Sequence, residues 1–264
     1  NVQEGETAVT TVVAADEDDD GLSFTIIGGA DQALFQLGVD SGVLTFAAPH
    51  DFETPADADA NNTYIVQVQV KDDGEGNLTV VQTLTVTVTD KAEAPVISSN
   101  GGGDTAEISI AENILDVTTV AATDPDDDGL AYTITGGVDK DLFDLNAAFG
   151  LLTFKAAPDF EAASDGDGDN NYIVEVTVTD DGTGNLTDSQ VITVTVTDIN
   201  EPPFFTSNGG GAAASISIAE RITAVTTATG TDPDGDDLTL SLSGGADVAL
   251  FSINEAGNLA FKAA

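Results

Sequence analysis

Short runs of alternating apolar and polar residues recur along the whole chain. Every second residue from Tyr172 to Val178 is Tyr or Val, while Glu175, Thr177 and Thr179 occupy alternate positions on the other face. Because successive strand residues point to opposite faces, this run presents one apolar face and one polar face. Clusters of Gly, Asp and Asn separate such runs, as turns separate strands. The pattern predicts an all-β protein without a long helix.

The pattern returns with a period as long as a whole domain. Asp16, Asp124 and Asp232 are 108 residues apart (124 − 16 = 232 − 124 = 108), and the same spacing relates Phe35 to Phe143. Solenoid repeats run only about 20 to 50 residues, so this period indicates tandem domains. We expect three repeats, at residues 1–95 with an incomplete first strand, 96–203 complete, and 204–264 without its last strands.

The complete repeat is predicted to be an immunoglobulin-like Greek-key β-sandwich. Its runs predict seven strands, near residues 106–111, 117–123, 130–135, 142–145, 150–155, 172–179 and 190–197. The third repeat stops before its last two strands, which would leave an open edge and half a core. We therefore expect residues 204–264 not to fold well alone, so that the chain continues or another chain completes them.

Charge and composition narrow the possible partners. Against 6 Lys and Arg stand 47 Asp and Glu, a formal charge of -41, which excludes nucleic acid and anionic membrane surfaces as electrostatic partners. No apolar run approaches the roughly 18 residues of a membrane-spanning helix, so direct membrane insertion is not expected. With no Cys and a single His, cysteine-bound or multi-histidine metal sites are impossible, and only oxygen ligands remain.

Five short acidic motifs recur in a fixed order. They are Ala111-Glu112-Asn113, Ala122-Thr123-Asp124-Pro125-Asp126, Asp159-Phe160-Glu161, Val178-Thr179-Asp180 and Asp198-Ile199-Asn200-Glu201-Pro202. In this order and spacing they resemble the calcium motifs of cadherins. The Asn-Glu-Pro-Pro linker and the Ser-Asn-Gly-Gly-Gly loops are similar to repeats of giant bacterial adhesins. The resemblance covers the whole chain and implies tandem cadherin-like β-sandwich domains with Ca²⁺ bound at their junctions.

The resemblance also implies which side chains bind Ca²⁺. The first junction would gather Glu4, Asp51, Glu53, Asp90 and Glu93 with Asp124, Asp126 and Asp180. The second would gather Glu112, Asp159, Glu161, Asp198, Asn200 and Glu201 with Asp232 and Asp234. Two carboxylates about 4 Å apart repel by about 4 kcal/mol at an effective dielectric of 20, so such clusters require cations. The first linker has Ala92 where the family has Asn, and it adds Lys91, so we expect weaker binding there.

Other features of the sequence that resemble functional sites are not expected to form them. The segment Asp165-Gly166-Asp167-Gly168-Asp169-Asn170 looks like half an EF-hand loop, but its twelfth position is Val176 instead of Glu, which favours a solvated loop. His50 is expected at the surface, and the repeated Phe residues are expected in the core. Paired carboxylates also serve glycosidases, but a chain with no Trp and three Tyr offers little for a sugar-binding cleft. An enzyme is therefore not expected.

Together these features predict a calcium-rigidified extracellular stalk of a bacterial surface adhesin or fibre that attaches cells to one another or to a matrix. Its partners would be calcium ions, neighbouring repeats of the same chain and other copies in a fibre. Two alternatives stay open: a subunit of a polymerising extracellular filament, and a cadherin-like module that itself binds carbohydrate or a second copy. Near-identical repeats without an aromatic-bearing variable loop favour the stalk.

Overall fold

The computed structural model describes residues 1–263, so Ala264, the last residue of the third predicted repeat, lies outside the described residues. The chain forms two compact units, which are described separately below. The first unit contains residues 1–98, 121–132 and 177–188, and the second contains residues 99–120, 133–176 and 189 onward. In the described part of the chain, no helix is both long and apolar enough to cross a membrane.

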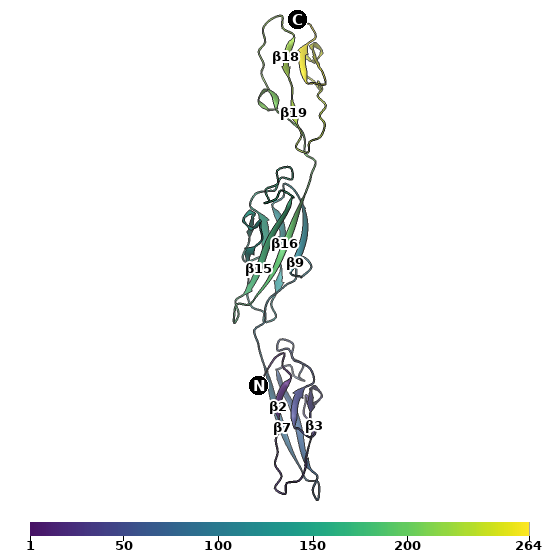
Figure 1. Cartoon of the computed structure of the whole chain (residues 1–264), viewed down its shortest axis with the longest axis vertical. Coiled ribbons are helices and arrows are strands. Elements are labelled where there is room, and N and C mark those ends of the chain that lie inside the picture. Colours follow the sequence, from purple (N-terminus) through teal and green to yellow (C-terminus); the bar gives the residue numbers. More distant parts are fainter. Residues whose placement is uncertain (264) are drawn as a thin grey trace. The chain divides into compact units, whose positions relative to one another are not determined.

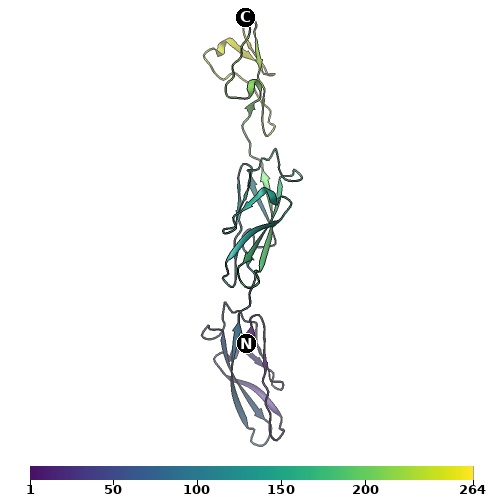
Figure 2. The same cartoon turned by 90° about the vertical axis from the view of Figure 1, so that its left-hand side faces the viewer.

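The N-terminal repeat lies in the first unit and consists of two β-sheets (Figure 1). One sheet has the order β1 (Val2–Gln3), β7 (Thr79–Thr89), β6 (Thr63–Asp72), β3 (Leu22–Gly28). The other has the order β2 (Ala8–Thr11), β5 (Val43–Phe46), β4 (Phe35–Leu37), with the 3-10 turn η1 (Gln32–Leu34) before β4. The first strand pairs parallel to the last, and the other pairs are antiparallel. Figure 2 shows the same purple-to-blue strands from the side.

The core of this repeat follows from the predicted alternation. Along β6, Tyr64, Val66 and Val68 are fully buried, while the residues between them are at least partly exposed. The buried set continues across the sheets to Phe35 and Phe46, whose rings stack 4.8 Å apart. Removing this much apolar area from water supplies the main driving force for folding.

His50 belongs to this core, contrary to the expectation of a surface position. Only 8% of it is exposed, and its ring centre lies 4.4 Å from that of Phe46 and 4.6 Å from that of Tyr64. The ring of His50 therefore packs with two aromatic rings of the core. Burial lowers the pKa of His50 by disfavouring the charged form, against an opposing effect of Asp57.

The second repeat shows the same two kinds of sheet. A four-stranded sheet has the order β12 (Leu130–Gly136), β15 (Asn171–Asp180), β16 (Thr187–Thr197), β9 (Thr105–Ala111), in which β16 and β9 run parallel. A three-stranded sheet has the order β10 (Asp116–Thr119), β14 (Leu151–Phe154), β13 (Phe143–Leu145), and the 3-10 turn η2 (Lys140–Leu142) precedes β13. As in the first repeat, alternate residues from Tyr172 to Val178 are fully buried.

One predicted strand is wrong in detail. Residues 117–123 do not form a single strand, because the chain leaves β14 after Thr119 and pairs next with a different partner. A short strand β11 (Ala122–Thr123) pairs antiparallel with β8 (Val96–Ile97), in the first unit. This switch positions Asp124 immediately after β11, where the chain turns.

Residues of the third predicted repeat form smaller sheets. β17 (Phe204–Phe205) pairs with β19 (Gly230–Thr231), and β18 (Ala224–Thr227) pairs with β21 (Asn258–Phe261), which also pairs with β20 (Phe251–Ile253). Two 3-10 turns, η3 (Ser207–Gly209) and η4 (Val248–Leu250), complete the assigned elements. Ile216, Ile218, Leu238 and Leu242 are exposed and lie outside these strands. The expectation that residues 204–264 do not fold well alone stays a prediction.

Candidate metal centres

Each of the first two repeats places one glutamate at the end of its first strand, tied to two other segments. Glu112 follows β9 and is only 1% exposed. Its two oxygens accept hydrogen bonds from the backbone N–H of Phe160 (3.0 Å) and of Ile199 (2.9 Å). In the first repeat, Glu4 accepts from the N–H groups of Phe52 (2.9 Å) and Lys91 (2.7 Å) in the same way. The buried carboxylate thus joins the first strand, the Asp-Phe-Glu segment and the linker.

At the first predicted junction, which lies within the first unit, the acidic side chains form three overlapping groups. Within each group, the carboxylate oxygens lie within 4.8 Å of one another. The groups are Glu4, Asp51 and Glu53; Glu53, Asp90 and Asp126; and Asp124, Asp126 and Asp128. They share Glu53 and Asp126, so neighbouring cations at this junction could share ligands.

Backbone hydrogen bonds hold the first linker against the following turn. The N–H of Glu93 donates to Asp126 Oδ2 (2.8 Å). Asp124 Oδ1 in turn accepts from the N–H groups of Asp126 (3.0 Å) and Asp128 (3.4 Å). Asp180, at the end of β15, is 4% exposed and accepts from the N–H of Gly182 through Oδ1 (3.0 Å). These bonds fix the carboxylates of the turn after β11 and of the end of β15, and they tie the backbone of the linker to that turn.

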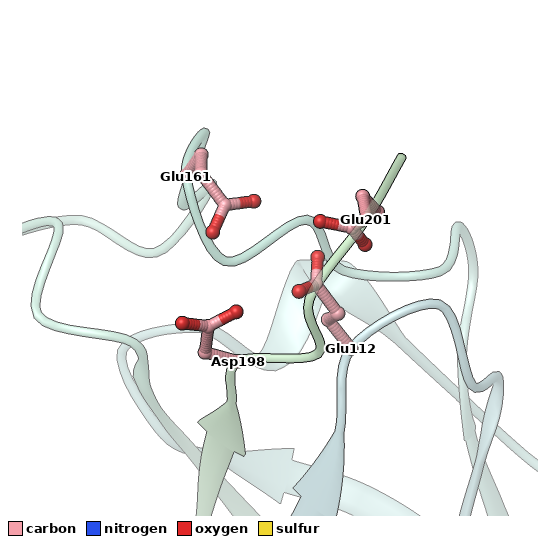
Figure 3. A group of neighbouring side chains, drawn as sticks. All are labelled: Glu112, Glu161, Asp198 and Glu201. Carbon is pink, nitrogen blue, oxygen red and sulfur yellow. The ribbon is translucent and has the colours of Figure 1, made fainter. Parts of the chain in front are cut away.

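The second predicted junction lies within the second unit and repeats this arrangement. Glu112, Glu161, Asp198 and Glu201 place their carboxylate oxygens within 4.8 Å of one another, and all four point toward a common space (Figure 3). The N–H of Glu201 donates to Asp234 Oδ2 (2.8 Å), as Glu93 donates to Asp126. Asp232 is linked to the set through its hydrogen bond from the N–H of Asp234 (3.1 Å).

Two of the predicted ligands have more local roles. Asp159 accepts a hydrogen bond from the N–H of Ala162 (3.0 Å), which shapes its own turn. Asn200 is exposed and donates weakly to the carbonyl of Glu201 (3.5 Å). Both stay predictions as metal ligands.

The structure adds acidic residues that the motif comparison overlooked. Asp128 joins Asp124 and Asp126, and in the first repeat Asp16, Asp18 and Asp20 form the equivalent group. The 108-residue period was the available signal, because Asp16 and Asp20 lie one period before Asp124 and Asp128.

Close packing of carboxylates changes their proton affinities. The pKa of Glu53 rises to about 7, first because its carboxyl group is partly removed from water although the residue as a whole is exposed, and then because Glu4, Glu93 and Asp126 repel it. Burial, followed by repulsion from neighbouring carboxylates, also raises the pKa of Asp90, Glu93, Glu161 and Glu201. For Asp198, burial is followed by contact with Asp234. Without a cation, the ionised clusters are therefore electrostatically unfavourable.

Several carboxylate oxygens at the junctions are buried and lack a hydrogen-bond partner among the described residues. They are Asp124 Oδ2, Asp126 Oδ1, Asp180 Oδ2, Glu201 Oε2 and Asp234 Oδ1. A buried charged oxygen left unpaired is costly. Calcium takes about six to eight oxygen ligands, with carboxylates prominent among them, so the residues at both junctions suit this ion.

Comparison of the sequence with those of known proteins finds protocadherins among its relatives. No protein-family model matches the chain. Protocadherin Fat 2 of Rattus norvegicus is 27% identical over 193 residues, which cover 70% of this chain and 4% of that protein. Protocadherin-23 of Homo sapiens is 30% identical over 216 residues, which cover 77% of this chain and 6% of that protein. The chain thus spans only a small part of these relatives, all of which are mammalian.

Solved structures agree more closely in fold than in sequence. The human CDH23 EC21-23 structure aligns with a TM-score of 0.55 and 21% identity, over 98% of this chain and 89% of that chain. Mouse Cadherin-23 EC22-24 aligns with a TM-score of 0.51 and 20% identity, over 99% of this chain and 84% of that chain. The predicted fold class is confirmed: the chain is an all-β protein of tandem cadherin-like β-sandwich domains.

Proposed function

We propose that this chain is a segment of a calcium-rigidified extracellular stalk in a large surface adhesin. The observation that carries the proposal is the convergence of carboxylates from a linker and from the segments on both sides of it. At the first junction, Glu53, Asp90 and Asp126 come from three different segments yet lie within 4.8 Å of one another. One Asp126 oxygen is buried there and has no hydrogen-bond partner among residues 1–263.

Calcium would act on the linker as a bridge. The N–H of Glu93 already docks on Asp126, but the surrounding carboxylates repel one another while they are ionised. A bound divalent cation replaces this repulsion with shared coordination, so the linker loses its freedom to bend. The hydrogen bond from the N–H of Glu93 to Asp126 and its counterpart from the N–H of Glu201 to Asp234 support the same role at both junctions.

An extracellular setting is supported by the calcium affinity expected of such sites and by the resemblance to cadherins. Affinities of extracellular calcium modules lie at about 10⁻⁴ to 10⁻³ M, so such a linker would stiffen outside the cell. The relatives named above are protocadherins, and the fold supports a role in adhesion. A bacterial host is supported by the Asn-Glu-Pro-Pro linker and the Ser-Asn-Gly-Gly-Gly loops. In a bacterial adhesin, the repeats would hold a contact-making tip away from the cell surface.

Trypsin offers a direct test, because Lys91 is an exposed cleavage site inside the first linker. Bound calcium should fix the linker and slow cleavage after Lys91 strongly, whereas a chelator should make this bond one of the first to be cut. Arg221 is exposed in a segment without strands and provides the internal control for trypsin activity in both conditions. Equal cleavage rates at Lys91 with and without calcium, relative to Arg221, would contradict the proposal.

A further inference from the structure

The loop that follows Ser164 in the second repeat contains a buried carboxylate that the junctions do not use. Asp165 is 7% exposed, so the expectation of a fully solvated loop is wrong for this residue. Its Oδ2 accepts a hydrogen bond from the N–H of Asp169 (2.9 Å). Its Oδ1 is buried and has no hydrogen-bond partner in the described part of the chain. A charged oxygen in this position is costly unless something binds it.

Two further carboxylates belong to the same short loop. The carboxyl group of Asp167 lies within hydrogen-bonding distance of that of Asp165, and the carboxylate of Asp169 follows two residues later. Two ionised carboxylates this close repel each other, and a cation bound between them would relieve that repulsion.

The equivalent loop of the first repeat has the same contact between two carboxyl groups, those of Asp57 and Asp59, but it places a side-chain amide beside them. Both oxygens of Asp57 accept backbone N–H groups, from Asn61 (2.9 Å) and Asn62 (3.1 Å). The side-chain amide of Asn61 also donates to Asp59 (2.8 Å). One period later the residue is Asp169 (61 + 108 = 169), which cannot donate and adds a third negative charge. The second loop therefore has an extra carboxylate where the first has an internal hydrogen-bond donor.

We propose that the loop 165–169 binds one hard divalent cation of the Ca²⁺ type, separate from those at the junctions. Asp165 Oδ1, Asp167 and Asp169 supply the protein ligands, and water or backbone carbonyls complete the coordination. Their spacing is that of the first three ligand positions of an EF-hand loop. The twelfth position is the buried Val176, which supplies no bidentate carboxylate, so this site is weaker than a complete EF-hand.

The loop is anchored to the core directly before its first carboxylate. The hydroxyl of the fully buried Tyr172 accepts a hydrogen bond from the N–H of Ser164 (3.1 Å). The first repeat has the same bond, from the N–H of Ala56 to the hydroxyl of Tyr64 (3.3 Å), so this anchor does not depend on a bound cation.

Native mass spectrometry of the full chain, titrated with calcium, tests this site by counting ions. The variant Asp167→Asn/Asp169→Asn changes only exposed side chains and should bind one calcium ion fewer than the wild-type chain. The matched control Asp59→Asn in the first repeat should bind the same number as the wild type. Circular dichroism with and without calcium confirms that each variant is folded.

Two outcomes would overturn the inference. If the double variant binds as many calcium ions as the wild type at saturation, the loop is not a cation site. If Asp59→Asn also loses one ion, the contrast between Asn61 and Asp169 does not determine binding. Because the junction residues are unchanged in both variants, calcium-dependent protection of Lys91 should persist, which separates this test from that of the stalk.

Discussion

The junction account predicts that one substitution has opposite effects with and without calcium. Asp126→Asn keeps an oxygen that can accept the hydrogen bond from the N–H of Glu93, so the linker contact survives. It removes a negative charge that lies within 4.8 Å of Glu53 and Asp90. In chelator, the variant should therefore be more stable than the wild type. In calcium it should be less stable, because a charged ligand is missing.

The size of the first effect follows from Coulomb's law. Two unit charges 4.8 Å apart repel by about 3.5 kcal/mol at an effective dielectric of 20 and by about 0.9 kcal/mol in water. Glu53 and Asp90 are exposed, so the lower value applies, and relief from both amounts to roughly 1 to 2 kcal/mol. The second effect is the loss of a calcium ligand, and each tenfold loss of affinity corresponds to about 1.4 kcal/mol.

Scanning calorimetry of the full chain measures both effects. For a domain of about 100 residues, 1 kcal/mol shifts the melting temperature by about 4 to 8 °C. Asp127→Asn is the matched control, because it removes the same charge from the exposed neighbouring position. A variant at Asp126 that melts lower than the wild type in chelator, or higher in calcium, would refute the account of repulsion relieved by coordination.

Three further predictions concern stability and pH. Glu112→Gln replaces one of two charge-assisted acceptors with a donor, while it also relieves repulsion within the cluster of Glu161, Asp198 and Glu201. The two effects oppose each other, so denaturant unfolding of the calcium-free chain should show a net cost of about 1 kcal/mol. Glu107→Gln, at an exposed strand position, should cost almost nothing. Gln190 is fully buried, and its side-chain amide donates a hydrogen bond to the carbonyl of Gly103 (2.8 Å). Gln190→Ala should therefore lower the free energy of unfolding by about 1 to 3 kcal/mol. Gln82→Ala, at the exposed equivalent position of the first repeat, should leave it unchanged. The pKa of Glu53 lies at about 7 in the folded calcium-free chain instead of 4.5, so folding tightens the binding of the proton on Glu53. The stability that this protonated Glu53 contributes is fully present below about pH 4.5 and is lost as the pH rises through about 7. Calorimetric titration should correspondingly show calcium affinity at the first junction rising up to about pH 7 and levelling above it, whereas a pH-independent affinity would contradict the role of Glu53.

Much of the fold could be predicted from the sequence, because the alternation of apolar and polar residues and the 108-residue repeat are both strong signals. The apolar face from Tyr172 to Val178 is buried as predicted, and the repeated Phe35 and Phe143 lie in the core. The break in the strand at residues 120–121 was not predicted, because the residues on both sides are equally suited to strands. Only the tertiary pairing of β11 with β8 distinguishes them.

The candidate sites were predictable to a similar degree and for a similar reason. Recurrence identified the acids at both junctions, but it could not show that Glu112 binds two backbone N–H groups while Asp159 binds its own turn. His50 was misplaced because a lone polar residue gives no indication that aromatic rings surround it. The burial of Asp165 could not be predicted either, because the residues of its loop are almost all small and polar.

Small-angle X-ray scattering of the full chain tests the central claim, that calcium stiffens the junctions, most directly. In millimolar calcium the scattering should fit a narrow distribution of particle dimensions, and in chelator a broad one, while circular dichroism shows that the strands persist in both. Replacing Asp124, Asp126, Asp198 and Asp234 together with Asn should give the broad distribution even in calcium. Scattering profiles that superimpose with and without calcium would contradict the account.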